Sequence, residues 1–475
     1  MKNLLIPSRH IIYSNGQYNS LINHLKNNTY ENIVFAITSS NLNNCKYSSL
    51  DILYRINMVD SLINSLKKEF DFKHKIVCIP HFYKTDDFAS NIIKYVNYNT
   101  ELDLNNDNTH VFSYGKYLGE VFIKNGYSVT IEIQVDHIKL FEKLYKEKDE
   151  NYFWENISIP SKYVFENQDE IINKTEKIWL DPILKETGSI TETRNYHTYA
   201  YDMSNEEVIN FKYNDIKPYI VEGKIVDEGC ADAALFIPIS RDFPDSDLIG
   251  VEITSDFIAR ANERIREGFF GGSFVNIVQA NLLNKIFEDN FVDTVICNST
   301  LHEVWSYNNK RESLNNYLKL KYNQLRSGGR LIARDVVGPG EPNKIVYMRD
   351  NTNNNELFKK FMNDFKQVRD IDTYEEVEIN GEKFIKSNLK IISEYLLHKD
   401  YEDNWQSEMN EEFCHLNTSS WQKVLEENNF KIVKLNAYKN KWIEENRLKD
   451  KIILLDENKQ SIDFPNTNIV IVAER

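Results

Sequence analysis

The feature that most constrains the fold is the repeated alternation of short apolar runs with amphipathic helical stretches along most of the 475 residues. This alternation is typical of α/β domains in which crossover helices join largely parallel strands. It occurs twice, over residues 1–165 and residues 216–475. The sequence therefore predicts two Rossmann-like, doubly wound α/β domains, and residues 166–215 between them are expected to form a linker with lid helices.

Apolar runs bounded by polar or turn-forming residues place the expected strands. In the first domain these runs predict strands at residues 3–7, 32–38, 75–80, 110–113 and 128–134. The second domain begins with a strand at 224–228 and ends with one at 467–473. Residues 345–430 interrupt its pattern with a charged stretch rich in Tyr and Trp, which we expect to be a helical insertion over the mouth of the sheet, ending in a helix at 420–428 before a strand at 430–435.

Composition narrows the function classes. A formal net charge of −15 and a pI near 5.3 argue against a broad nucleic-acid surface, so no nucleic-acid partner is expected. No apolar stretch approaches the length of a membrane span, and the N-terminus does not resemble a signal peptide. The five cysteines are scattered, which favours reduced thiols and no metal site. We expect a cytoplasmic protein that handles a small molecule; the oligomeric state is not indicated.

The segment KIVDEGCADAAL, residues 224–235, has the pattern of a nucleoside-binding first crossover. An apolar strand carries Asp227 near its end, and a turn of small residues from Gly229 to Ala233 leads into an apolar helix start. Such a turn must be short of side chains so that a ligand can approach the backbone at the carboxyl end of the strand. The helix that follows offers free N–H groups.

Polar residues at the ends of the next strands extend this predicted site. Glu252 closes the second strand, where a carboxylate can accept hydrogen bonds from a ribose diol. Asn281 follows the third strand and is expected to bond an adenine amino group, while Asn298 ends the fourth strand. A Gly328-Gly329 turn precedes the fifth strand.

This ordered series resembles class I S-adenosylmethionine-dependent methyltransferases, whose first motif is an acidic residue followed by Gly-x-Gly-x-Gly. Here the motif stands as Asp227, Gly229, Ala231 and Ala233, with two glycines replaced by alanine. The resemblance implies a class I methyltransferase fold and S-adenosylmethionine as cofactor, bound by Asp227, Gly229, Ala231, Glu252, Asn281 and Asn298. The alternatives are a dinucleotide-binding domain, for which GCADAA lacks the GxGxxG pattern, and a copy that binds nothing.

Residues beyond the fourth strand face the transferred methyl group in this fold family, and here they include His302 and Glu303. His302 is the predicted general base, because imidazole is best poised for proton transfer near pH 7, and Glu303 would orient it or contact the acceptor. The alternative is that His302 only packs at a helix start. The resemblance also implies that a Tyr-rich segment before the first strand closes over the cofactor, and Arg194 in it could meet a carboxylate. That segment contains Arg194, Tyr196, His197, Tyr199 and Tyr201. Within the insertion, the acceptor pocket is expected to be lined by Trp405, Glu408, Cys414, His415 and Trp421.

The N-terminal segment SRHIIYSNGQ resembles the loop of cytidylyltransferase-like nucleotidyltransferases. Arg9 fits that loop, and Arg55 falls at the arginine position of a later helix. Ser14 and Gln17 stand where the family has its two histidines. Because those histidines stabilise the triphosphate during transfer, the resemblance implies the fold with an altered or non-catalytic site.

Three hypotheses follow for the whole chain. The first is a small-molecule methyltransferase with an accessory nucleotidyltransferase-like domain. The second is a bifunctional enzyme that transfers both a nucleotidyl and a methyl group, and the third is a non-catalytic nucleotide-binding protein. The methyltransferase motifs are better preserved than the nucleotidyltransferase ones, which favours the first.

Overall fold

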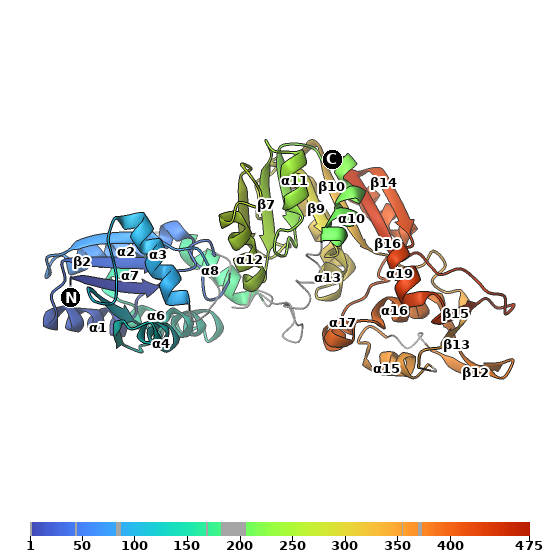
Figure 1. Ribbon diagram of the computed structural model, residues 1–475, viewed down its shortest axis with the longest axis horizontal. Helices are drawn as coiled ribbons and strands as arrows, with labels where there is room; N and C mark the ends of the chain where they lie inside the picture. The colour runs from blue at the N-terminus through green and yellow to red at the C-terminus, as the bar shows by residue number, and fades with distance from the viewer. Residues whose placement is uncertain are drawn as a thin grey trace. The chain divides into compact units, whose positions relative to one another are not determined.

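The computed structural model describes residues 2–42, 45–81, 87–167, 170–181, 206–353, 355–368 and 373–475 (Figure 1). The chain divides into two compact units. The first comprises Met1–Ser189 with Ile253–Glu263 and Ile277–Asn281, and the second comprises Ile190–Glu252, Arg264–Asn276 and Leu282–Arg475. Among the described residues, no helix combines the length and apolar character needed to cross a bilayer.

The first unit contains a five-stranded parallel sheet in the order β3-β2-β1-β4-β5. All five predicted strands are present, although the last is shorter than expected because it ends at Ile131. This order, in which the chain reverses direction across the sheet beside its first strand, is that of a doubly wound fold. The strands are β1 (Asn3–Ser8), β2 (Asn32–Ile37), β3 (Lys73–Cys78), β4 (Thr109–Ser113) and β5 (Ser128–Ile131).

Helices cover both faces of this sheet because successive strand residues point to opposite sides. Leu4 and Phe35 pack into one apolar cluster with residues of α1, α2 and α7, whereas Leu5 and Val34 pack into another with residues of α3 and α4. The helices are α1 (Asn15–Asn27), α2 (Ile52–Leu66), α3 (Phe88–Thr100), α4 (Lys116–Lys124), α5 (His137–Phe141), η1 (Glu142–Lys146), α6 (Glu150–Asn156), α7 (Ile159–Glu166) and α8 (Glu170–Leu180).

The second sheet has seven strands in the order β14-β16-β10-β9-β6-β7-β8. Strands β6, β7, β9 and β10 pair in parallel, and β16 inserts antiparallel between β10 and β14. The predicted first strand is found at its expected bounds, and the final strand is found one residue later than predicted. The strands are β6 (Lys224–Glu228), β7 (Asp247–Glu252), β8 (Val275–Gln279), β9 (Val292–Asn298), β10 (Leu325–Val336), β14 (Lys431–Tyr438) and β16 (Asn468–Glu474).

A buried ion pair ties this sheet to one of its crossover helices. Glu228 of β6 contacts the ammonium of Lys321, and both side chains are fully buried. The Tyr317 hydroxyl donates to the other carboxylate oxygen at 2.6 Å. The helices around the sheet are α10 (Glu206–Ile216), η2 (Lys217–Tyr219), α11 (Phe236–Asp242), α12 (Ser255–Arg266), α13 (Leu301–Ser306), α14 (Arg311–Gln324) and α18 (Thr418–Glu427).

The insertion contains the expected helices and also a four-stranded sheet that the sequence analysis did not predict, in the order β12-β13-β11-β15. Its strands pair antiparallel, and an Asn380-Gly381 turn with both φ angles positive joins β12 to β13. Asn-Gly favours such a hairpin, so the signal was present in the sequence. The elements of the insertion are β11 (Ile345–Asp350), α15 (Glu356–Asp364), β12 (Glu375–Ile379), β13 (Glu382–Asn388), α16 (Leu389–His398), η3 (Glu402–Asn404) and α17 (Trp405–Glu408). Between β14 and β16 the chain adds α19 (Lys441–Ile443), η4 (Glu444–Leu448) and β15 (Ile452–Leu455), and β15 completes the sheet.

Candidate cofactor and acceptor site

The turn after β6 keeps a glycine-like backbone although two of its positions are alanine. Gly229, Ala231 and Ala233 have φ angles of 75°, 47° and 61°. These values lie in the left-handed region, where a Cβ atom clashes with the backbone and costs about 1–2 kcal/mol per residue. The conformation that the predicted ligand-binding turn requires is therefore present, at the expense of strain in the two alanines.

Hydrogen bonds from the neighbouring strand hold this turn in place. The backbone N–H groups of Gly229 and Cys230 donate to the carbonyl of Val251 at 2.8 and 3.2 Å. Gly229 also faces Thr300, because an added Cβ would lie 2.5 Å from the Thr300 hydroxyl oxygen. A side chain at residue 229 would thus disrupt the approach of the turn to the segment that follows β9.

Glu252 supports the same turn directly. Its carboxylate accepts a hydrogen bond of 2.9 Å from the backbone N–H of Ala231, and the residue is 7% exposed. The next residue along the turn, Asp232, pairs with Arg264 at 2.6 Å. The structure therefore brings Glu252 to the turn, as the sequence predicted, and gives it a structural contact that the sequence did not indicate.

Asp227 lies buried at the end of β6 near other acidic groups. Burial raises the pKa of Asp227 to about 7, an effect that Glu252 and Glu228 increase and Lys212 opposes. Burial, with the nearby charge of Arg334, lowers the pKa of Lys212 to about 8. The predicted first acidic residue of the motif is thus a carboxyl group that changes its charge near neutral pH.

The amide of Asn298 is the clearest sign of a missing partner at this edge of the sheet. Both its side-chain oxygen and its side-chain nitrogen are buried, and neither has a hydrogen-bond partner among the described residues. Buried amides are normally satisfied, so this one fits a ligand or an ordered water at the end of β9. Asn281, predicted to bond an adenine, instead donates to Asp181 at 3.1 Å within the first unit.

His302 is held by a carboxylate from the neighbouring strand. Its ring Nδ1 lies 2.6 Å from Oδ1 of Asp335, which is fully buried in β10. The other oxygen of Asp335 accepts from the backbone N–H groups of Leu301 and His302 at 2.7 and 3.2 Å. One carboxylate therefore caps the first turn of α13 and orients the imidazole.

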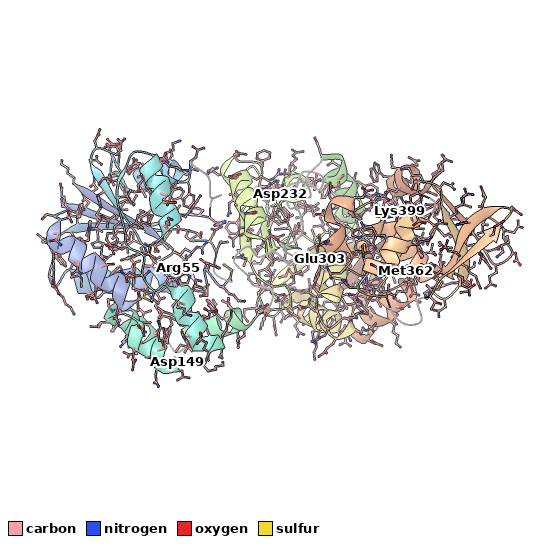
Figure 2. The ribbon with its side chains drawn as sticks, turned by 90° about the horizontal axis from the view of Figure 1, so that it is seen from below. Arg55, Asp149, Asp232, Glu303, Met362 and Lys399 are labelled. Atoms are coloured by element: carbon pink, nitrogen blue, oxygen red, sulfur yellow. The ribbon has the colours of Figure 1, made fainter. Side chains whose placement is uncertain are left out.

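A residue of the insertion reaches the opposite nitrogen of the same ring. The Nε2 atom of His302 lies 3.4 Å from Oε2 of Glu411, which is 1% exposed. Glu303, labelled in Figure 2, is half-buried on the adjacent position of α13. Its carboxylate lies within 4.8 Å of both donors. Phe413 packs its ring edge to face with His302 at 5.1 Å. The insertion thus covers His302.

These carboxylates control the charge of the imidazole. Burial alone would lower the pKa of His302, but the charge and hydrogen bond of Asp335, with those of Glu411, raise it well above its usual value. Burial would raise the pKa of Asp335, yet the interaction with His302 lowers it. The arrangement favours a charged imidazole near neutral pH, which is the wrong state for the general base that the sequence predicted.

Sequence reasoning missed Asp335 and Glu411. The sequence did indicate a role for Asp335, because an acidic residue inside the apolar run LIARDVV must find a buried partner. Glu411 had none, because it lies more than a hundred residues from His302 in a charged stretch. Neighbouring Glu412 accepts from Trp305 at 2.8 Å and pairs with Lys390 at 2.6 Å.

The residues expected to line an acceptor pocket lie on three segments. Cys414 and His415 lie on the segment next to Glu411 and Phe413, and His415 contacts the ring of Trp305. Trp421 is fully buried on α18, and Trp405 packs in the core of the insertion, where it bonds Asp364. Glu408 is buried beside it on α17. The Tyr-rich segment expected to close over the cofactor lies outside the described residues: Arg194, Tyr196, His197, Tyr199 and Tyr201.

In the N-terminal unit, the residues that replace the two histidines form a helix cap. The Ser14 hydroxyl accepts from the backbone of Gln17 at 3.2 Å, and the Gln17 side chain accepts from the backbone of Ser14 at 3.0 Å. Arg55 is fully buried and donates to the carbonyls of Arg9, Thr38, Ser39 and Leu42. These side chains hold the loop together rather than face a ligand.

Comparison with known proteins finds a family model that matches part of the chain. Residues 221–429 match the family model described as a methyltransferase domain. Comparison with curated proteins finds no significant match.

Similar solved structures include three methyltransferases. An S-adenosylmethionine-dependent methyltransferase from Archaeoglobus fulgidus is 14% identical, covers 59% of this chain and 100% of its own, and has a TM-score of 0.35. One from Clostridium acetobutylicum is 13% identical over 59% of this chain and 99% of its own, with a TM-score of 0.33. Geranyl diphosphate C-methyltransferase from Streptomyces coelicolor A3(2) is 11% identical over 60% of this chain and 85% of its own, with a TM-score of 0.35.

The match covers the β6 turn, the end of β9 and the Glu411 segment. Residues 221–429, which make up most of the second unit, therefore match a methyltransferase domain.

Proposed function

We propose that the second unit methylates a small molecule whose acceptor atom lies beside His302 and Glu303. The observation that carries this proposal is the burial of His302 beneath the insertion. His302 is 7% exposed, and Glu411 and Phe413 cover it. A macromolecular surface cannot reach side chains buried in this way, whereas a small acceptor can be enclosed there.

The cofactor is proposed to bind across the carboxyl ends of β6, β7 and β9. The left-handed turn at Gly229 and Ala231 brings backbone close to a ligand, and Asp227 and Glu252 supply carboxylates for its polar groups. The unpartnered amide of Asn298 fits a ligand with both hydrogen-bond donors and acceptors. When bound, S-adenosylmethionine supplies an activated methyl group. A contact from Asn281 remains a sequence-based proposal.

We propose that His302 and Glu303 position the acceptor. Orientation of two reactants supplies much of the acceleration in a bimolecular transfer, so fixed side chains here have a direct catalytic value. Asp335 fixes the ring through Nδ1 and leaves Nε2 directed toward the covered space. Because the charged ring is favoured, His302 acts here by contact and orientation rather than by taking the acceptor's proton.

The first unit is proposed to be an accessory domain that does not transfer nucleotides. The guanidinium of Arg55 donates hydrogen bonds to backbone carbonyls, and the Ser14–Gln17 pair caps α1. A cytoplasmic location and the absence of a nucleic-acid partner remain proposals that rest on the acidic composition and the scattered cysteines.

The test is transfer of a labelled methyl group. The purified chain would be incubated with S-adenosylmethionine labelled in its methyl group and with a cell extract separated by size. The proposal expects label in the small-molecule fraction and about 10²-fold less with His302→Ala, the scale of a lost positioning contact. Label found only in protein or nucleic acid, or equal labelling by the variant, would contradict it.

A further inference from the structure

We propose that His302, Glu303 and Glu411 bind a divalent transition-metal ion, with Mn²⁺ and Zn²⁺ as the best-matched ions. One ligand atom from each of these residues lies within 4.8 Å of the other two. The imidazole and the two carboxylates come from α13 and from the insertion, so the site forms only when these two parts of the second unit fold together.

The spacing of the two buried donors suits a shared ion. The Nε2 atom of His302 and Oε2 of Glu411 are 3.4 Å apart. That separation is beyond the usual range for a good N–H···O hydrogen bond. Two ligands that each lie about 2.0–2.2 Å from one ion, at tetrahedral or near-right angles, are about 3–3.5 Å apart. The observed distance therefore fits two ligands of one ion as well as the ion pair that these groups form without one.

Each buried donor is also fixed by a partner outside the three-residue cluster. His302 donates Nδ1–H to Asp335, which is the carboxylate–histidine arrangement found behind metal-bound imidazoles. Nε2 would become the ligand atom when the ion displaces the proton that the charged ring carries there. The Tyr307 hydroxyl donates to Oε1 of Glu411 at 2.9 Å, which directs Oε2 toward His302. These outer contacts orient the two donors toward the same point before any ion is present.

The donor set selects the class of ion. One imidazole with two carboxylates suits Zn²⁺, Mn²⁺ or Fe²⁺, whereas Ca²⁺ and Mg²⁺ prefer oxygen ligands alone. Three protein ligands leave positions open on the ion. If the acceptor lies here, as proposed above, an acceptor oxygen would take an open position, and the ion would help it lose a proton.

Binding is tested with the metal alone, on full-length protein stripped of metal. Mn²⁺ would be titrated while its free concentration is followed by electron paramagnetic resonance, and Zn²⁺ would be titrated by calorimetry. We expect one ion per chain, and at least about tenfold weaker binding in Glu303→Gln. Glu303 is half-buried, so this variant should fold. Glu312→Gln, an exposed carboxylate on the next helix, is the matched control and should bind as the parent does.

A thermal scan supplies a second readout. An ion that binds the folded state raises the midpoint, so Mn²⁺ should stabilise the parent and Glu312→Gln more than Glu303→Gln. No binding by the parent, or equal binding by all three proteins, would overturn the inference. Titration of S-adenosylmethionine in the absence of metal tests the cofactor site separately. If the protein binds the cofactor but no metal, the metal site is rejected and the proposed cofactor site stands.

Discussion

The two strained alanines of the β6 turn allow a sharp test of the structure. Replacing alanine by glycine usually destabilises a protein, because glycine has more freedom to lose on folding. That cost is about 0.4–1 kcal/mol. At Ala231 the φ angle is 47°, so glycine would also relieve about 1–2 kcal/mol of left-handed strain. Ala231→Gly should therefore stabilise the second unit by about 0.5–1 kcal/mol.

Ala233 provides an internal comparison. Its φ angle is 61°, but its methyl group is fully buried. Loss of that methyl costs about 0.8 kcal/mol, which offsets most of the relief, so Ala233→Gly should be close to neutral. Ala333→Gly, at a buried alanine of β10 without a positive φ angle, is the control and should destabilise by about 1 kcal/mol or more.

Differential scanning calorimetry of the full chain gives the measurement. For a unit of this size, 1 kcal/mol corresponds to a shift of about 2–4 °C in the transition midpoint. Ala231→Gly should raise the midpoint of the second unit by about 1–4 °C, Ala233→Gly should leave it nearly unchanged, and Ala333→Gly should lower it. If Ala231→Gly lowers the midpoint as the control does, residue 231 does not have the strained left-handed conformation.

Three further predictions concern charge and the first unit. Lys321→Met leaves the buried Glu228 without its cationic partner and should lower the free energy of unfolding in urea by about 3–5 kcal/mol. The double variant Lys321→Met with Glu228→Gln should restore most of that loss, and an unchanged single variant would contradict the pairing. The pKa of Asp227 is raised from an ordinary 3.8 to about 7. The protonated carboxyl therefore contributes folding stability that is fully present below pH 4 and is lost as the pH rises to about 7. The stability of Asp227→Asn relative to the parent should increase across that window and level off above it. A difference that does not vary between pH 4 and 8 would show that Asp227 is not buried in this way. The first unit should release no pyrophosphate from ATP or CTP, and release that Arg9→Ala abolishes would refute its accessory role.

Local patterns made most of the fold predictable. The apolar run before Asp227 and the run of the final strand identified the first and last strands of the second sheet to within one residue. The insertion was harder, because its charged residues suggested helix throughout. The Asn380-Gly381 turn was the overlooked hairpin signal, and β15 joins that sheet from between β14 and β16, which no local pattern reveals.

The site was only partly predictable for the same reason. Glu252 ends β7 and His302 lies at the start of α13, shortly after β9, so their place at the edge of the sheet follows from parallel topology. The contact of Glu252 with Ala231 depends on the turn conformation, and the approach of Glu411 to His302 depends on how the insertion packs. The charge state of His302 depends on that packing as well, which is why its predicted role as a base required revision.

The most direct test of the central claim is calorimetric titration of the full chain with S-adenosylmethionine. The account predicts one binding site per chain and an affinity that falls by about 10–150-fold in Glu252→Ala, which corresponds to the loss of about 1.5–3 kcal/mol from a charged hydrogen bond. Glu263→Ala provides a control on the neighbouring helix and should bind as the parent does. Failure of the parent to bind, or an affinity in Glu252→Ala equal to that of the parent, would contradict a cofactor site at the β6 turn.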